Sequence, residues 1–220
     1  GTLQLLQNTV ESTVEKFIFA STGGAIYGEQ DYFPAGEEHP QKPSSPYGLS
    51  KLSVEAYLGF YQEQYGLKST ILRYGNVFGP RQNPNGEAGV VAIFCKRLLK
   101  DQAPIVNGDG EQTRDYIFVG DVVRANLLAL SPNSSGTFNV GTGQETSVNE
   151  LTRMLLRIAG SDISVQTSQK NRYEQRRSCL DYKKLKESLN WNPEVSLEEG
   201  LIETYNFFKN NEREINGNRI

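Results

Sequence analysis

A tyrosine and a lysine one helical turn apart are the residues of this chain best suited to acid–base chemistry. Ser45 can cap a helix that begins at Pro46, so Tyr47 and Lys51 share one helix face. A free phenol titrates near pH ~10, and a neighbouring ammonium lowers that pKa by favouring the phenolate. We therefore predict Tyr47 as a catalytic base and Lys51 as the residue that lowers its pKa. The same spacing also occurs on surface helices without any function.

A second segment supplies hydroxyl groups. Residues Lys16 to Gly28 form a short apolar run that ends in Ser21, Thr22 and glycines. We predict a buried strand over 17–21 and a loop over 27–45. In an open parallel sheet, ligands bind at the carboxyl ends of the strands, which is where Ser21 and Thr22 would lie.

Composition narrows the class of protein. The chain has 220 residues, a net charge of −3 and 37% hydrophobic residues, which suits one core and a small second lobe. It has neither a bilayer-length apolar run nor the order of a signal peptide, so we expect a cytoplasmic protein. Cys95, Cys179 and the single His39 indicate neither a metal site nor a disulfide, and we expect both cysteines to be packing residues. Without a basic stripe, nucleic acid is not an expected partner.

Taken together, the two segments resemble the extended short-chain dehydrogenase/reductase family, and within it the NAD-dependent nucleotide-sugar epimerases and dehydratases. The resemblance runs from the first residues to about Trp191. It implies an α/β fold: the C-terminal part of a doubly wound (Rossmann-like) parallel sheet with a small α+β substrate lobe. We expect residues 1–82 and 115–150 in the sheet domain, 83–114 and 151–208 in the lobe, and a frayed tail over 209–220.

The expected elements follow from periodicity and from helix-boundary signals. The predicted helices are 2–13, 46–65 (ending at Gly66), about 86–100, 119–130 (starting at Asp121), 147–158 and one from 181. The further predicted strands are 69–74, 137–140 and 164–167, with a strand, a glycine turn and a strand across 104–117.

The resemblance also implies a glycine-rich turn for the dinucleotide pyrophosphate, and no such turn follows a hydrophobic strand here. We therefore expect the chain to be a fragment that lacks the N-terminal cofactor half and is inactive alone. The family further implies a homodimer through helices 2–13 and 46–65. Apolar residues on more than one face of 46–65 agree with that, although a helix buried within its own monomer would show the same pattern.

By resemblance, the reaction is epimerisation at C4 of a UDP-sugar of the UDP-glucose/UDP-galactose type, through a 4-keto intermediate. Tyr47 would take the proton of the 4-hydroxyl group, Thr22 would bond the same oxygen, and Lys51 would hold the ribose of NAD. Gly75 would lie beside the nicotinamide. The implied substrate contacts are Asn76, Gly89, Val90, Val91, Ile105, Val106, Asn107, Arg114, Arg172, Glu174 and Ser178.

Some of these assignments leave alternatives open. Arg114 suits a diphosphate because its planar fork gives two parallel bonds, but it could instead pair with Asp115 or Asp121. Arg172 is displaced by one residue from the arginine of the family pattern, whereas Glu174 fits the acidic ribose ligand. Ser178 occupies a position whose bulk gates the sugar, and its small size suggests room for an N-acetyl group.

Other functions remain open as well. A 4,6-dehydratase of this family carries Asp-Glu directly after the threonine, where this chain has Gly23 and Gly24, so elimination would lack its acid and base. A decarboxylase or ketoreductase of the same family is a further alternative, since the latter would use the same three catalytic residues. A non-catalytic nucleotide-sugar binding or dimerisation module is the alternative from another class.

Overall fold

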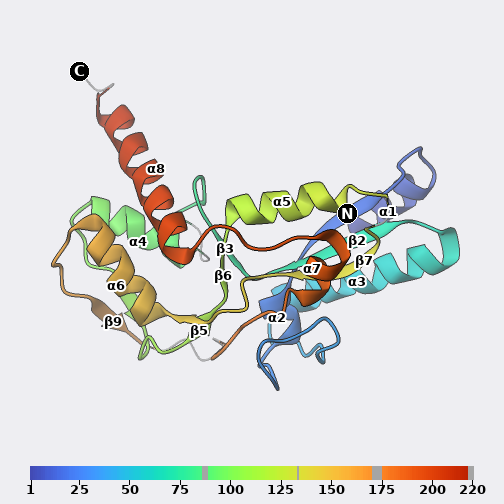
Figure 1. Ribbon diagram of the computed structural model, residues 1–220, viewed down its shortest axis with the longest axis horizontal. Helices are drawn as coiled ribbons and strands as arrows, with labels where there is room; N and C mark the ends of the chain where they lie inside the picture. The colour runs from blue at the N-terminus through green and yellow to red at the C-terminus, as the bar shows by residue number, and fades with distance from the viewer. Residues whose placement is uncertain (86–88, 133, 170–174, 218–220) are drawn as a thin grey trace.

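The computed structural model describes residues 1–85, 89–132, 134–169 and 175–217. The helices are α1 (Thr2–Val10), α2 (Gly23–Tyr27), α3 (Pro46–Tyr65), α4 (Val90–Leu99), α5 (Val119–Ala129), α6 (Val148–Ala159), α7 (Lys183–Leu189) and α8 (Leu197–Gly217). The strands are β1 (Phe17–Thr22), β2 (Ser69–Tyr74), β3 (Asn76–Phe78), β4 (Ile105–Asn107), β5 (Thr113–Arg114), β6 (Tyr116–Phe118), β7 (Gly136–Val140), β8 (Thr146–Ser147) and β9 (Gln166–Ser168). The molecule is elongated, with α1, α3, α5 and α7 around a sheet at one end and α4, α6 and α8 at the other (Figure 1).

A three-stranded parallel sheet in the order β1-β2-β7 forms the first part of the fold. Thr22 lies in register with Tyr74, which in turn lies beside Val140, so the three strands end at one edge. The predicted strands 69–74 and 137–140 are confirmed. The strand over 17–21 extends to Thr22 and is half-buried rather than buried, because within the described residues it pairs only with β2.

The two faces of this sheet carry different helices. Phe17, Phe19 and Ile71 point to one face, where they pack with α1 and α3. Ile18, Leu72 and Phe138 point to the other, where they pack with residues of α5 and α7 and with Trp191. This is the period-two alternation of a strand, and it produces a layer of helices on each side of the sheet.

Helix α3 begins and ends as the sequence predicts. The hydroxyl group of Ser45 accepts a 3.1 Å hydrogen bond from the backbone N–H of Gly48, and the helix stops at Gly66 with φ +68°. A Cβ on Gly48 would lie 2.5 Å from the carbonyl oxygen of Ala25, so this glycine allows α3 to approach α2 closely. That approach brings the first turn of α3 to the end of β1.

Helix α2 was not among the predicted helices. Two glycines lower the helix propensity there, which is why periodicity did not indicate a helix. The Thr22 side chain caps it by accepting a 3.4 Å hydrogen bond from the N–H of Ala25. Thr22 therefore ends β1 and begins α2.

The second core lies between α4, α6 and α8 and includes Phe78 and Phe118 of the short strands β3 and β6. The three strands between 104 and 117 do not pair with one another. β4 runs parallel to β9, β5 runs antiparallel to β8, and β6 runs parallel to β3. Positive φ at Gly108 and Gly110 turns the chain between β4 and β5, so each strand reaches a different partner.

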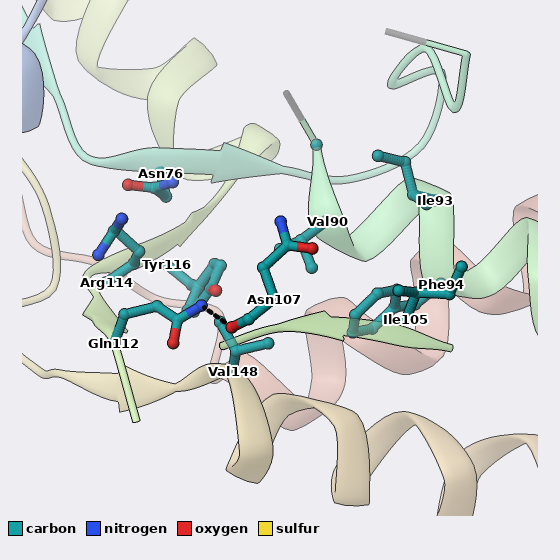
Figure 2. Close-up of a pocket in the computed structure, with 11 residues that line it drawn as sticks. Asn76, Val90, Ile93, Phe94, Ile105, Asn107, Gln112, Arg114, Tyr116 and Val148 are labelled. Carbon is teal, nitrogen blue, oxygen red and sulfur yellow. Dashed lines mark hydrogen bonds between the residues drawn. The ribbon is translucent and has the colours of Figure 1, made fainter. Parts of the chain in front are cut away.

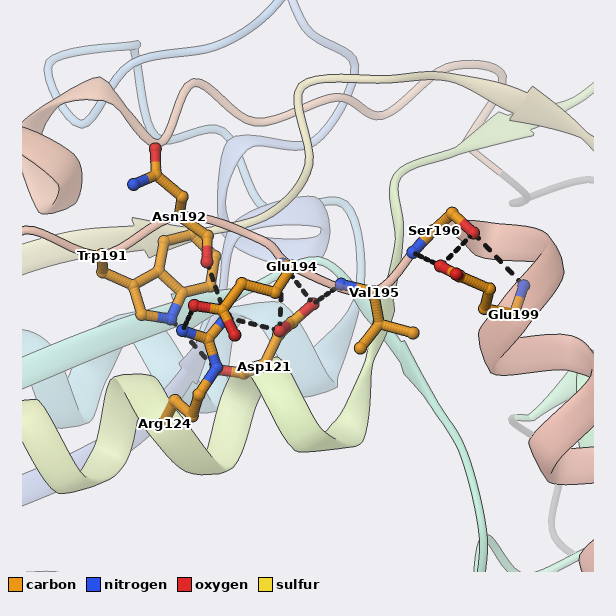
Figure 3. A network of polar contacts seen from close by, with 8 residues as sticks. All are labelled: Asp121, Arg124, Trp191, Asn192, Glu194, Val195, Ser196 and Glu199. Carbon is orange, nitrogen blue, oxygen red and sulfur yellow. Dashed lines mark hydrogen bonds and ion pairs between the residues drawn. The ribbon is translucent and has the colours of Figure 1, made fainter.

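A buried carboxylate ties α5 to the segment that leads into α8 (Figure 3). The Asp121 carboxylate forms a 2.6 Å ion pair with Arg124. It also accepts 3.2 Å hydrogen bonds from the N–H groups of Glu194 and Val195. Trp191 donates its ring N–H to the Asp121 carbonyl at 3.1 Å. Helix α8 then continues to Gly217, past residue 209 where we expected fraying to start.

Other expectations were close. Helix α1 ends three residues before the predicted limit, α5 starts two residues before Asp121, and the hydroxyl of Ser147 caps α6 by accepting from Glu150 N–H at 3.1 Å. Cys95 and Cys179 are buried thiols, and burial raises the pKa of each to about 12. Among the described residues, no helix is both long and apolar enough to cross a membrane.

Candidate functional site

Tyr47 and Thr22 meet at the carboxyl edge of the sheet. Both line a cavity of about 220 Å³, here called the smaller cavity, together with Gly75 and Asn76. The Thr22 side chain lies close enough to the Tyr47 phenol to lower its pKa as a hydrogen-bonding neighbour. The two side chains therefore lie at one site, and 56% of the Tyr47 surface is exposed.

Lys51 lies beside this pair and does not line the smaller cavity. Its Nζ donates a 2.8 Å hydrogen bond to the carbonyl oxygen of Ala20 and lies 5.8 Å from the centre of the Tyr47 ring. Partial burial raises the pKa of Tyr47, and the hydrogen bond from Thr22 opposes that rise. The ammonium is bound to the backbone of β1 in this structure, and its expected lowering of the Tyr47 pKa stays a prediction.

Gly75 needs the absence of a side chain. A Cβ on Gly75 would lie 2.8 Å from the carbonyl oxygen of Asp115. The N–H of Gly75 donates a 2.9 Å hydrogen bond to the carbonyl oxygen of Val140. The same Asp115 carbonyl accepts a 2.7 Å hydrogen bond from the N–H of Asn76. Close backbone packing therefore fixes the positions of Gly75 and Asn76 in the wall of the smaller cavity.

The side chain of Asp115, which packs beside Gly75, is completely buried. Its carboxylate accepts hydrogen bonds from the N–H and hydroxyl groups of Thr142 at 2.8 and 2.7 Å, and from the N–H groups of Gly143 and Leu180 at 3.1 Å. Burial raises the pKa of this carboxyl group, against the effect of those bonds. Asp115 thus connects the loop after β7 to the start of β3 at Asn76.

A larger cavity of about 410 Å³ lies between β3, α4, β4 and β5. Figure 2 shows Asn76 and Arg114 close together at one end and Ile105 with Phe94 at the other. The cavity therefore has a polar end with a guanidinium group and an apolar end. Asn76, Gly89, Val90 and Tyr116 line both cavities, so the smaller cavity adjoins the polar end of the larger one.

Most of the predicted substrate residues that the structure describes meet here, but Val106 and Ser178 do not. Val91 lines the smaller cavity, and Ile105 and Asn107 line the larger one. Val106 does not line either cavity. It is 2% exposed and packs in the second core, because successive side chains of β4 point to opposite sides.

Arg114 lines the larger cavity and donates a 2.7 Å hydrogen bond from Nη1 to the carbonyl oxygen of Thr113. The carboxylates of Asp115 and Asp121, its alternative partners, are bound by the loops described above. Arg172 and Glu174 lie outside the described residues. Ser178 is buried below Gly24, on which an added Cβ would lie 3.1 Å from the serine hydroxyl, and it lines neither cavity.

Three lining residues with polar side chains were not anticipated. Gln82 lines the smaller cavity and donates to the Val77 carbonyl at 2.8 Å, while Gln112 lines the larger one and donates to the Asn107 carbonyl at 3.1 Å. Tyr116 lies between the two cavities. A sequence signal existed only for Gln112 and Tyr116, which flank Arg114 at alternate positions along one extended segment.

Comparison with known proteins agrees with this geometry. Residues 1–204 match the GDP-mannose 4,6 dehydratase family. The UDP-glucose 4-epimerase of Mycolicibacterium smegmatis is 41% identical over 96% of this chain and 67% of its own length.

Two solved structures also match. The Thermotoga maritima UDP-glucose 4-epimerase with UDP-glucose is 50% identical, with a TM-score of 0.92 over 96% of this chain and 69% of that one. The Thermus thermophilus UDP-glucose 4-epimerase in complex with NAD is 43% identical, with a TM-score of 0.89 over 94% and 68%. The chain thus spans about two thirds of these proteins, and it belongs to the nucleotide-sugar epimerase and dehydratase family, in which it is similar to UDP-glucose 4-epimerases.

Proposed function

We propose that the protein epimerises a UDP-sugar of the UDP-glucose/UDP-galactose type at C4, with NAD as a recycled cofactor. One observation carries the proposal: the Tyr47–Thr22 pair lines a cavity that adjoins, through Asn76, a larger cavity with Arg114 at the near end. A nucleotide diphosphate sugar has the matching order of parts, namely a base, an anionic diphosphate and a sugar.

The larger cavity accounts for the nucleotide. Its apolar end, at Ile105 and Phe94, suits the flat faces of a base, and Asn107 there offers hydrogen-bonding groups to the base edge. At the other end Arg114 would pair with the diphosphate, because a guanidinium group can give two parallel charge-assisted bonds to phosphate oxygens. Asn76 would then contact the part that joins phosphate to sugar.

The smaller cavity accounts for proton transfer. With the sugar placed there, the Tyr47 oxygen would take the proton of the 4-hydroxyl group and later return it to the 4-keto oxygen, while Thr22 would hold that oxygen by a hydrogen bond. Positions next to Gly75, where any side chain would meet the Asp115 carbonyl, fit a flat nicotinamide ring. When bound, NAD would supply the acceptor and the donor of the hydride. Lys51 and Tyr47 would hold its ribose.

Epimerisation accounts for the residues after Thr22 better than dehydration does. A 4,6-elimination needs an acid and a base near C5 and C6, and Gly23 and Gly24 carry no titratable group. The first glycine is packed tightly as well, since a Cβ there would lie 2.6 Å from the Leu180 side chain. A match to a family described as a dehydratase therefore does not favour dehydration in this chain.

The sugar itself is a finer proposal. Ser178 is the smallest hydroxyl-bearing residue that could occupy its position, and it faces Gly24 across the start of α2. By resemblance, a small residue at this position would leave space for an N-acetyl group, although Ser178 packs closely against Gly24 and lines neither cavity here. Turnover of UDP-glucose without any turnover of UDP-N-acetylglucosamine would exclude this extension while leaving the main proposal intact.

The test of the main proposal is interconversion of UDP-glucose and UDP-galactose by the full natural chain with NAD. We expect Tyr47→Phe to lower kcat by about 10²–10⁴-fold, the usual contribution of a general acid–base group. NADH should stay bound during turnover. Release of NADH in proportion to product would identify a ketoreductase, and formation of a 4-keto-6-deoxy sugar would identify a dehydratase.

A further inference from the structure

A buried polar network lies directly behind the candidate catalytic pair, on the α3 face of the sheet. The Glu55 carboxylate accepts a 2.5 Å hydrogen bond from the hydroxyl of Ser21 and 2.6 to 3.2 Å bonds from the Arg73 guanidinium. Both ionic side chains are almost completely buried, with 3% and 5% of their surface exposed. Arg73 also donates to the Tyr27 hydroxyl at 2.9 Å, so α2 is joined to the same network.

The position of Glu55 on its helix gives this network a direct connection to the site. Tyr47, Lys51 and Glu55 are spaced by four residues and share one face of α3. Each lies beside one of the last three residues of β1: Tyr47 lines a cavity with Thr22, Lys51 bonds the Ala20 carbonyl, and Glu55 bonds Ser21. Of the three, only Glu55 is buried, so it is the fixed contact of the series.

The role in catalysis rests on the proposed function. We propose that Glu55, held by Arg73 and bound to Ser21, is a positioning residue that sets the place of α3 on β1 and thereby keeps Tyr47 against Thr22. Ser21 and Thr22 are adjacent in a strand, so a shift of α3 relative to Ser21 also moves Tyr47 relative to Thr22. The residues of this network line neither the larger nor the smaller cavity. Its loss should therefore affect the proton-transfer step and spare nucleotide binding.

Ser21→Ala is the sharpest variant. It removes the hydrogen bond between Glu55 and Ser21 of β1 and leaves the Glu55–Arg73 ion pair in place. No buried charge therefore loses its partner. We expect kcat to fall about 10- to 100-fold, the usual effect of misplacing a catalytic group by a fraction of an ångström to one ångström, with KM within about twofold of wild type. Glu55→Gln should act in the same direction but leaves Arg73 unpaired, so its folded fraction has to be measured first.

A readout without turnover separates this proposal from the proposed function. In protein labelled with ¹³Cζ-tyrosine, the Tyr47 resonance is assigned with Tyr47→Phe and followed through a pH titration. The hydrogen bond from Thr22 favours the phenolate, so weakening it in Ser21→Ala should move the Tyr47 titration to higher pH. Thr204→Val is the matched control, because it also removes one buried hydroxyl group, which bonds the Gly200 carbonyl in α8.

The outcomes are distinct. A titration moved to higher pH in Ser21→Ala and unmoved in Thr204→Val supports the positioning role, even where wild-type protein shows no epimerase activity and the proposed function fails. A titration that stays in place or moves to lower pH overturns the positioning role. A fall in kcat that only follows the folded fraction, equal in both variants, overturns it as well.

Discussion

The amine of Lys51 donates a 2.8 Å hydrogen bond to the backbone carbonyl of Ala20, two residues before Thr22, which lines a cavity with Tyr47. The ammonium is therefore fixed on β1 and does not bond the phenol. Partial burial raises the pKa of Tyr47 above the ordinary value of a phenol. A base that works at neutral pH needs a lower pKa, so we infer that the positive charge of a bound nicotinamide has to supply the difference.

The first prediction concerns that pKa. In ligand-free protein we expect Tyr47 to titrate above the ordinary value of ~10 for a phenol. Thr22→Val should raise the pKa further, because the lost hydrogen bond favours the phenolate, whereas Lys51→Met should change it by less than about half a unit, since exposed charges several ångströms apart are screened. Nuclear magnetic resonance of labelled tyrosine measures all three. A Tyr47 pKa below 10 without ligand would contradict the structure.

The second prediction concerns the nucleotide. Arg114→Met should weaken UDP binding by about 10- to 100-fold, which corresponds to the roughly 1.5–3 kcal/mol of a hydrogen bond to a charged group. Isothermal titration calorimetry of UDP measures the affinity directly. Arg153→Met, on the exposed side of α6, is the control and should bind UDP as wild type does. Equal affinity of both variants would remove Arg114 from the diphosphate site.

The parts of the fold that could be predicted from sequence were those with local signals. A capped start at Ser45 and a stop at Gly66 fixed the limits of α3, and continuous apolar runs indicated β2 and β7. Tyr47 and Thr22 could be brought together from sequence because strand ends and helix starts share one edge in parallel sheets.

The remaining features depended on contacts between distant segments. The orientation of Lys51 is set by a carbonyl in β1, and the inward turn of Val106 depends on the pairing of β4 with β9. Helix α2 forms in a glycine pair because Thr22 caps it and Gly48 allows α3 to pack against it. None of these relations has a signal in local sequence.

A third prediction concerns association of two copies of the protein. Helices α1 and α3 pack together, and Leu3, Leu5, Tyr57 and Phe60 on them are 41–54% exposed. The predicted second apolar face of 46–65 is thus exposed to solvent in the monomer. We expect a homodimer through these helices that Leu5→Glu with Phe60→Glu dissociates, because two buried charges without partners are costly. Sedimentation velocity measures the mass, and Ile202→Glu on α8 is the control.

The last prediction concerns the link between α5 and α8. Asp121→Asn should lower the free energy of unfolding by about 3 kcal/mol, because it leaves Arg124 without its nearly buried partner and weakens two backbone contacts that fix the segment before α8. Glu198→Gln breaks the exposed pair with Arg157 and should change the same quantity by less than about 1 kcal/mol. Urea denaturation followed by circular dichroism compares the two. Since Asp121 lines neither cavity, the folded variant should still bind UDP with wild-type affinity, and equal losses of stability in the two variants would show that the buried carboxylate contributes no more than a surface pair.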